Sequence, residues 1–100
     1  MSIKTAEYIN EVMANGDRLL RCPEVEALRG FRRGRIYHEC RQGLLPKPIK
    51  NGSRSSAWPL SEILAVNRAR IEGKTNDEIR SLVLELVAQR KAREEYGGGQ

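Results

Sequence analysis

The sequence predicts a mostly α-helical fold with one small β-hairpin, and three observations lead to it. Two short helical segments, 22–28 and 33–42, are separated by a turn that contains Gly30. A Pro-x-Pro stretch follows the second helix and must be extended, because proline fixes φ and disfavours helical backbone at the residue before it. Two longer segments with helical apolar periodicity, 59–72 and 73–96, complete the fold. Helix, tight turn, helix and hairpin, in that order, predict a winged helix-turn-helix.

The first helix, Cys22 to Leu28, follows a short extended lead-in that begins at Arg18. Pro23 suits the first helical turn, where its missing N–H would have no partner in any case. Val25 and Leu28 are three residues apart, so we expect both side chains to face the core.

The second helix runs from about Arg33 to Gln42. Ile36 and Cys40 lie four residues apart and form its inward stripe, with Tyr37 beside them. The remaining faces carry basic side chains, so this helix is predicted to present a cationic surface.

The segment after this helix is predicted to be the hairpin, or wing. Residues 46–50 form the first strand, 51–55 the turn and 56–58 the returning strand. The prolines place the hairpin at a sheet edge, because proline cannot donate to a strand ladder. Trp58 is expected to pack the wing onto the helices.

Two more helices follow the wing. The first is predicted to begin at Pro59 and to bury a partial apolar face made of Leu60, Ile63, Leu64, Val66, Asn67 and Ile71. The second is predicted to begin with a capping box, Thr75 and Glu78. Its apolar stripe repeats at i, i+3, i+4 and i+7 and consists of Ile79, Leu82, Val83 and Leu86. This stripe either closes the small core or pairs with a second copy of the chain.

One hundred residues are expected to form one small domain with appended segments. We divide the chain into an N-terminal helix or arm at 1–17, a winged helix-turn-helix domain at 18–72, a C-terminal amphipathic helix at 73–96 and a flexible tail at 97–100. Within the arm, Thr5 to Ala14 has helical periodicity.

The positive charge of the chain is concentrated in one segment. Residues 31–58 carry seven basic side chains and one acidic one, whereas 1–30 sum to −1 and 59–100 are neutral, so the whole net charge of +5 comes from this segment. A basic patch between neutral flanks is typical of a nucleic-acid-binding surface.

Nine residues are the candidates for DNA contact. The second helix and its start supply Arg32, Arg33, Arg35, His38, Arg41 and Gln42, and the wing supplies Lys47, Lys50 and Arg54. Arginine can bridge O6 and N7 of guanine in the major groove, although each helix arginine could instead contact a phosphate or be solvated. Arg54, at the tip of a flexible turn, suits a narrow minor groove, and the alternative is an ordinary surface arginine.

Other functional classes find little support. There is no paired-carboxylate, nucleophile–base or Gly-rich phosphate constellation, so we expect no enzyme and no cofactor. Cys22, Cys40 and His38 cannot supply a structural zinc set. No apolar run approaches the ~18 residues of a membrane span, and no secretory leader is recognisable. We therefore expect a cytoplasmic protein, located at the nucleoid, that does not interact with membranes.

The stretch from Arg18 to Trp58 resembles the AlpA family of phage-type regulators, within the MerR-like and excisionase-like winged helix-turn-helix domains. The resemblance rests on RLLRCPEV, on GRIYHECRQGLLPKP, on Arg54 in the wing turn and on Trp58 after it, and it extends loosely over SEILAVNRARI. It implies double-stranded DNA as the partner, with the second helix in the major groove and the wing in the minor groove. It also implies either transcriptional control of integration genes or an excisionase role (recombination directionality factor). An integrase, and a second copy of the chain on DNA, are the further candidate partners.

The sequence departs from this family at the start of the second helix. A small polar cap is usual there, and Arg32-Arg33-Gly34 stands in its place. Because arginine lacks the short oxygen that caps a helix, this helix could start one or two residues later than in relatives. Which arginines face the bases depends on that start.

Two alternatives to DNA binding stay open. The chain could be a protein-interaction adaptor that uses its C-terminal apolar helix. It could instead bind RNA, although Phe31, Tyr37 and Trp58 are expected in the core rather than as stacking platforms.

Overall fold

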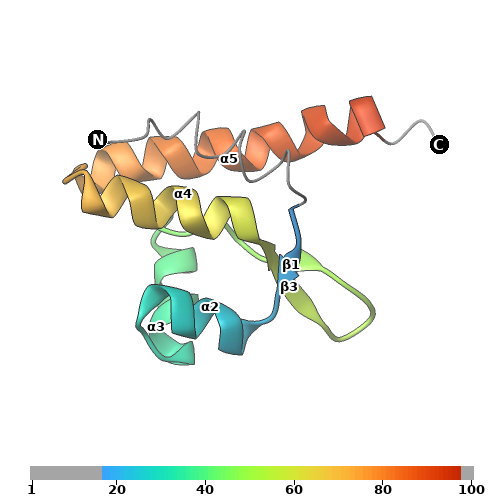
Figure 1. The fold of residues 1–100 in the computed structure, drawn as a ribbon, viewed down its shortest axis with the longest axis horizontal. Helices are drawn as coiled ribbons and strands as arrows, with labels where there is room; N and C mark the ends of the chain where they lie inside the picture. Colours follow the sequence, from blue (N-terminus) through green and yellow to red (C-terminus); the bar gives the residue numbers. More distant parts are fainter. Residues whose placement is uncertain (1–16, 98–100) are drawn as a thin grey trace.

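The computed structural model describes residues 17–97, with side chains described up to residue 90. The predicted helix from Thr5 to Ala14 and the last three residues of the predicted tail lie outside this part. The elements in chain order are β1 (Leu19–Leu20), α2 (Cys22–Arg29), α3 (Arg33–Arg41), β2 (Ile49–Lys50), β3 (Ser56–Pro59), α4 (Leu60–Ile71) and α5 (Asn76–Gly97). Figure 1 shows α4 and α5 side by side in one layer, with α2 and α3 on the other side of α4.

The predicted wing is present and is part of a small three-stranded sheet. β3 is central, with β2 and β1 antiparallel on either side of it. The two-stranded hairpin therefore gains a third strand from the extended lead-in, where Leu20 pairs with Trp58. β2 lies at an edge, as its neighbouring prolines require.

The bounds of the first predicted helix are correct to within one residue, and its predicted buried face is partly wrong. Val25 is fully buried, but Leu28 is 39% exposed. The inward face is instead formed by Cys22, Val25 and Arg29, which are spaced three and four residues apart. A buried arginine thus takes the place that the apolar pattern had assigned to Leu28.

The helix α4 is buried on more than one side, because α2 and β3 pack on one face and α5 on another. Ile63 and Val66 are buried as predicted, together with Ala65 and Ala69. The prediction for Ile71 is wrong, since this side chain is 75% exposed at the last position of the helix.

The predicted capping box of α5 is confirmed. The Thr75 N–H donates to Glu78 Oε1 at 2.8 Å, and the Glu78 N–H donates to the Thr75 hydroxyl at 3.2 Å. The apolar stripe of α5 packs into the common core, with Ile79, Val83 and Leu86 buried and Leu82 partly buried. The stripe therefore closes the core of this chain.

Candidate nucleic-acid interface

The surface of α3 is cationic, and its buried face is the one that was predicted. Ile36 and Cys40 are buried. Gly34, His38 and Arg41, spaced four and three residues apart, run along the opposite, exposed face. The six candidate residues of this helix and its ends are all exposed: Arg32, Arg33, Arg35, His38, Arg41 and Gln42.

The helix begins at Arg33, as the sequence predicted, although no short polar side chain caps it. Arg32 is the N-cap in an extended conformation (φ −84°, ψ 168°), and its side chain makes no capping hydrogen bond. The first turn holds no acidic residue. The positive end of the helix dipole is therefore surrounded by arginines instead of a carboxylate.

Two arginines of α3 lie over aromatic rings. The guanidinium of Arg33 is 5.0 Å from the ring centre of Tyr37, and that of Arg35 is 4.5 Å from the ring centre of Phe31. Such cation–π contacts restrict the rotamers of a long side chain. The aromatic residues thus orient cations at the surface, and they remain partly buried against the core.

The single acidic residue of the basic segment points inward. Glu39 is 2% exposed and accepts a hydrogen bond from Arg29 Nη2 at 2.8 Å, with Arg35 Nε 3.7 Å from its other oxygen. Arg29 also donates to the side chain of Asn67 on α4, at 2.7 Å. The negative charge is therefore used to join α2, α3 and α4, and the outer surface of α3 is more basic than the residue count suggests.

Sequence reasoning missed this buried pair. The signal was available in the spacing, since Glu39 lies three residues after Ile36 and directly before Cys40, on the inward side of the helix. Nothing local identified its partner, because Arg29 belongs to a different helix.

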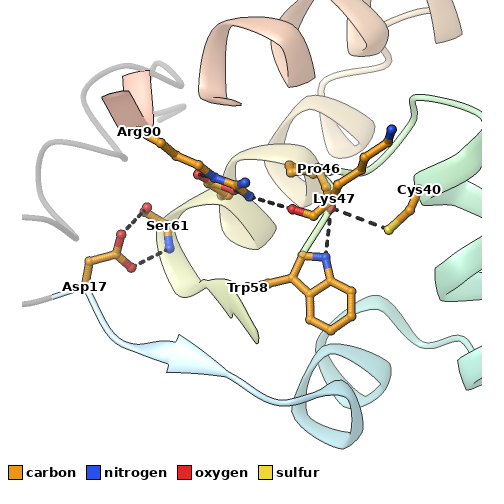
Figure 2. A network of polar contacts seen from close by, with 8 residues as sticks. Asp17, Cys40, Pro46, Lys47, Trp58, Ser61 and Arg90 are labelled. Carbon is orange, nitrogen blue, oxygen red and sulfur yellow. Dashed lines mark hydrogen bonds and ion pairs between the residues drawn. The ribbon is translucent and has the colours of Figure 1, made fainter. Parts of the chain in front are cut away.

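The base of the wing is held by a network of polar contacts, shown in Figure 2. The indole N–H of Trp58 donates to the carbonyl oxygen of Pro46 at 2.8 Å, and Cys40 Sγ lies 3.4 Å from the same oxygen. Trp58 is fully buried and meets the Tyr37 ring edge-on, with 5.8 Å between ring centres. The prediction that Trp58 packs the wing onto the helices is confirmed.

The three candidate residues of the wing, Lys47, Lys50 and Arg54, are all exposed. The turn is closed by a hydrogen bond from the Asn51 N–H to the Ser55 carbonyl oxygen at 2.8 Å. Gly52 has φ 109°, a conformation that side-chain-bearing residues rarely adopt, so glycine is needed at this position. Figure 1 shows α3 and the hairpin loop on the side of α4 that faces away from α5.

The two cysteines are free and buried. Burial raises the pKa of both the Cys22 and the Cys40 thiol, which disfavours the reactive thiolate form. Among the described residues, no group of three or more His, Cys, Asp or Glu side chains is placed to hold a metal ion.

Over residues 17–97, no helix combines the length and apolar character that crossing a bilayer requires.

Comparison with known proteins gives one family and one relative. Residues 18–65 match the family described as prophage CP4-57 regulatory protein (AlpA). The uncharacterized protein ORF88 of Enterobacteria phage P4 is 40% identical over 58 residues, which are 58% of this chain and 66% of the phage protein. No solved structure gives a significant match. The region that matches the family contains α2, α3 and the whole sheet, so the chain is similar to the AlpA prophage regulatory family over these elements.

Proposed function

We propose that the chain is a phage-type regulator that binds double-stranded DNA through α3 and the wing. The observation that carries this proposal is the separation of charge on α3. Its arginines and His38 are exposed, while Glu39, the sole acid of the basic segment, is buried against Arg29. The outer face of this helix, at Gly34, His38 and Arg41, thus offers phosphates and base edges a cationic surface that carries no carboxylate.

The proposed docking places α3 in the major groove. A groove about 12 Å wide admits a helix, and the buried stripe of α3 leaves the face of Gly34, His38 and Arg41 to approach the bases. Arg32, Arg33, Arg35 and Gln42 flank this face, where phosphates or bases lie within reach. The wing then brings Arg54 to the neighbouring minor groove, with Lys47 and Lys50 near the backbone.

The regulatory assignment follows the similarity to the AlpA family. Its finer form is a MerR-like winged helix-turn-helix protein of a prophage or integrative element, acting at the nucleoid as an excisionase, as a transcription regulator or as both. An excisionase would work beside an integrase on attachment-site DNA, and a second copy of the chain could bind cooperatively there. A footprint over attachment and promoter DNA distinguishes these roles.

The salt dependence of DNA binding tests the proposal. With about five or six phosphate contacts, log affinity should fall with log salt at a slope near −5. Arg41→Ala should lower the affinity and make the slope shallower by about 1. Lys74→Ala, which removes a positive charge from the exposed loop between α4 and α5, is the matched control and should leave both unchanged. Affinity that does not depend on salt contradicts the proposal.

A protein-interaction adaptor is the second candidate, and one observation favours it. Leu84, on the outer side of α5, is 73% exposed. An exposed apolar side chain of this size suits a protein partner. In that case Arg33→Ala and Arg54→Ala would leave the activity intact while Leu84→Asp would abolish it, which is the reverse of what DNA binding predicts.

A further inference from the structure

The linker between α3 and β2 connects the two elements that we propose to contact DNA, and α5 holds it at both ends. At the α3 end, Arg80 Nε donates to the carbonyl oxygen of Gln42 at 2.9 Å. At the wing end, Arg90 Nη2 donates to the carbonyl oxygen of Lys47 at 2.8 Å. Figure 2 shows the second contact, with Arg90 reaching from α5 across the start of α4 to Lys47.

Arg90 is itself fixed in place by a buried carboxylate. Its Nε and Nη2 donate to the two oxygens of Glu62 at 2.8 and 2.6 Å, and Glu62 is fully buried in the first turn of α4. A bidentate arginine–carboxylate pair fixes the plane of the guanidinium as well as its distance. The carbonyl of Lys47 thus meets a donor whose position is set by α4 and α5 together.

Arg80 makes an ion pair on its own helix and passes close to Gly43. Its Nη1 lies 3.2 Å from Asp77, one helical turn earlier. Its aliphatic part runs past Gly43, where a β-carbon would lie 3.6 Å from Arg80 Cγ. Because Gly43 has φ 75°, the chain reverses sharply at the end of α3, directly under this side chain.

The two arginines are ten residues apart on one continuous helix, which corresponds to about 15 Å along its axis. Both acceptors are backbone carbonyls, so these two contacts fix the ends of the linker through its main chain. Its middle is held by the burial of Leu45 and Pro46 and by the Pro46 carbonyl, which accepts from the Trp58 indole.

We propose that α5 sets the distance and orientation between α3 and the wing, and that Arg80 and Arg90 are positioning residues for DNA recognition. This inference rests on the proposed function. A major-groove helix and a minor-groove wing can engage one duplex together only if their separation matches the spacing of the grooves. A helix that holds both ends of the intervening linker supplies that match before DNA arrives, which reduces the entropy cost of binding.

Double-mutant cycles with the wing arginine test the inference. The variants are Arg80→Gln, at a side chain that is 41% exposed, and Arg90→Met combined with Glu62→Gln, which removes both charges of the ion pair between α5 and α4. Each should weaken DNA binding about fivefold when Arg54 is present and less than about 1.5-fold in an Arg54→Ala background, because the wing then has no minor-groove arginine whose position matters. Lys74→Gln is the control for the loss of one positive charge.

Equal loss in both backgrounds would overturn the inference, because a purely stabilising role of α5 is indifferent to Arg54. Affinities are compared at a temperature where circular dichroism shows every variant folded. If the double variant at Arg90 does not fold, the Arg80→Gln cycle decides the question alone.

A second measurement needs no DNA and separates this inference from the proposed function. In the free protein, ¹⁵N relaxation should show faster motion at the amides of residues 47–56 in the Arg90 variant, with residues 22–41 unchanged. A wing that stays as rigid as in the parent chain refutes the positioning role, even if DNA binding is confirmed. A mobile wing in a protein that binds no DNA supports the positioning contact and refutes the proposed function.

Discussion

Gly34 occupies the exposed face of α3, where glycine brings no benefit to the fold itself. A β-carbon added there would meet no atom within 4 Å, and the backbone has no positive φ. Glycine inside a helix costs about 0.5–1 kcal/mol relative to alanine. The residue therefore gives up stability at the position that the proposed docking brings nearest to DNA.

Gly34→Ala should accordingly move two properties in opposite directions. The free energy of unfolding, measured by urea denaturation, should rise by up to about 0.5–1 kcal/mol, the value for a helix interior, because Gly34 lies in the first turn of α3. The affinity for the target DNA should fall severalfold, because a methyl group now separates the helix backbone from the duplex. A more stable protein with unchanged affinity would show that this turn of α3 stays clear of DNA.

The buried ion pair of Arg29 and Glu39 leads to a prediction about stability. Glu39→Leu should lower the free energy of unfolding by about 3–5 kcal/mol, since it leaves the Arg29 charge buried without its carboxylate. The double substitution Arg29→Met with Glu39→Leu should recover most of that loss, because no unpaired charge remains. Chemical denaturation of the two variants beside the parent chain measures both effects, and a double variant no more stable than Glu39→Leu would contradict this account.

Residue-scale predictions from the sequence succeeded where burial depends on a helix's own periodicity and failed where it depends on a neighbour. Val25, Ile36, Val83 and Leu86 are buried as their spacing indicates. Leu28 is exposed because Arg29, held by partners on two other helices, occupies the inward position. No local pattern contains that information.

At the scale of elements, carboxylates accept hydrogen bonds from backbone N–H groups at the starts of three helices. Glu24 accepts from the Arg21 N–H at the start of α2, and Glu78 accepts from the Thr75 N–H at the start of α5. At the start of α4, Asp17 accepts from the Ser61 N–H at 2.9 Å, from 44 residues earlier in the chain. The start of α3 has arginines instead, which fits the proposal that an external anion approaches there.

The cap of α5 makes a prediction about pH. The hydrogen bond from the Thr75 backbone N–H holds the pKa of Glu78 below its ordinary value of 4.5. A carboxylate whose pKa is lower in the folded state stabilises the fold above the ordinary value, and the effect is lost as pH falls through the folded value. Glu78→Gln, whose side-chain amide oxygen can still accept the hydrogen bond, should therefore lower Tm at neutral pH, and its Tm difference from the parent chain should shrink as pH falls below 4.5. A Tm difference that does not shrink on acidification would contradict this origin.

The elements themselves were largely predictable. All four described helices were expected within three residues of their bounds, because caps, prolines and glycines mark their ends. β1 was missed as a strand, since two residues are too short for an alternating pattern and its partner β3 lies about forty residues away.

At the scale of the whole molecule, α5 is built into the unit that the wing and α3 form. Its apolar stripe closes the core, and its arginines reach the α3–β2 linker. The Arg90 side chain on α5 pairs with the buried carboxylate of Glu62 on α4, 28 residues earlier in the chain. Long-range pairing of this kind is invisible to a reading of local composition.

A chain that ends at Lys74 should therefore not fold. It would lose the burial of Ile79, Val83 and Leu86, each worth about 1.5–3 kcal/mol, against a typical total stability of about 5–15 kcal/mol. Thermal melting followed by circular dichroism should show no cooperative transition for this truncated chain, whereas the full chain should show one. A sharp transition in the truncated chain would show that residues 18–72 are an independent domain.

The packing of Trp58 gives the protein a built-in optical reporter. It is the sole tryptophan of the chain, and its fully buried indole lies between the Tyr37 ring and the Pro46 carbonyl. All tryptophan fluorescence consequently originates at the seam between the hairpin and the helices, with a short emission wavelength while water is excluded. Any partner that lifts the hairpin off this seam will shift the emission to the red, without a dye attached to the chain.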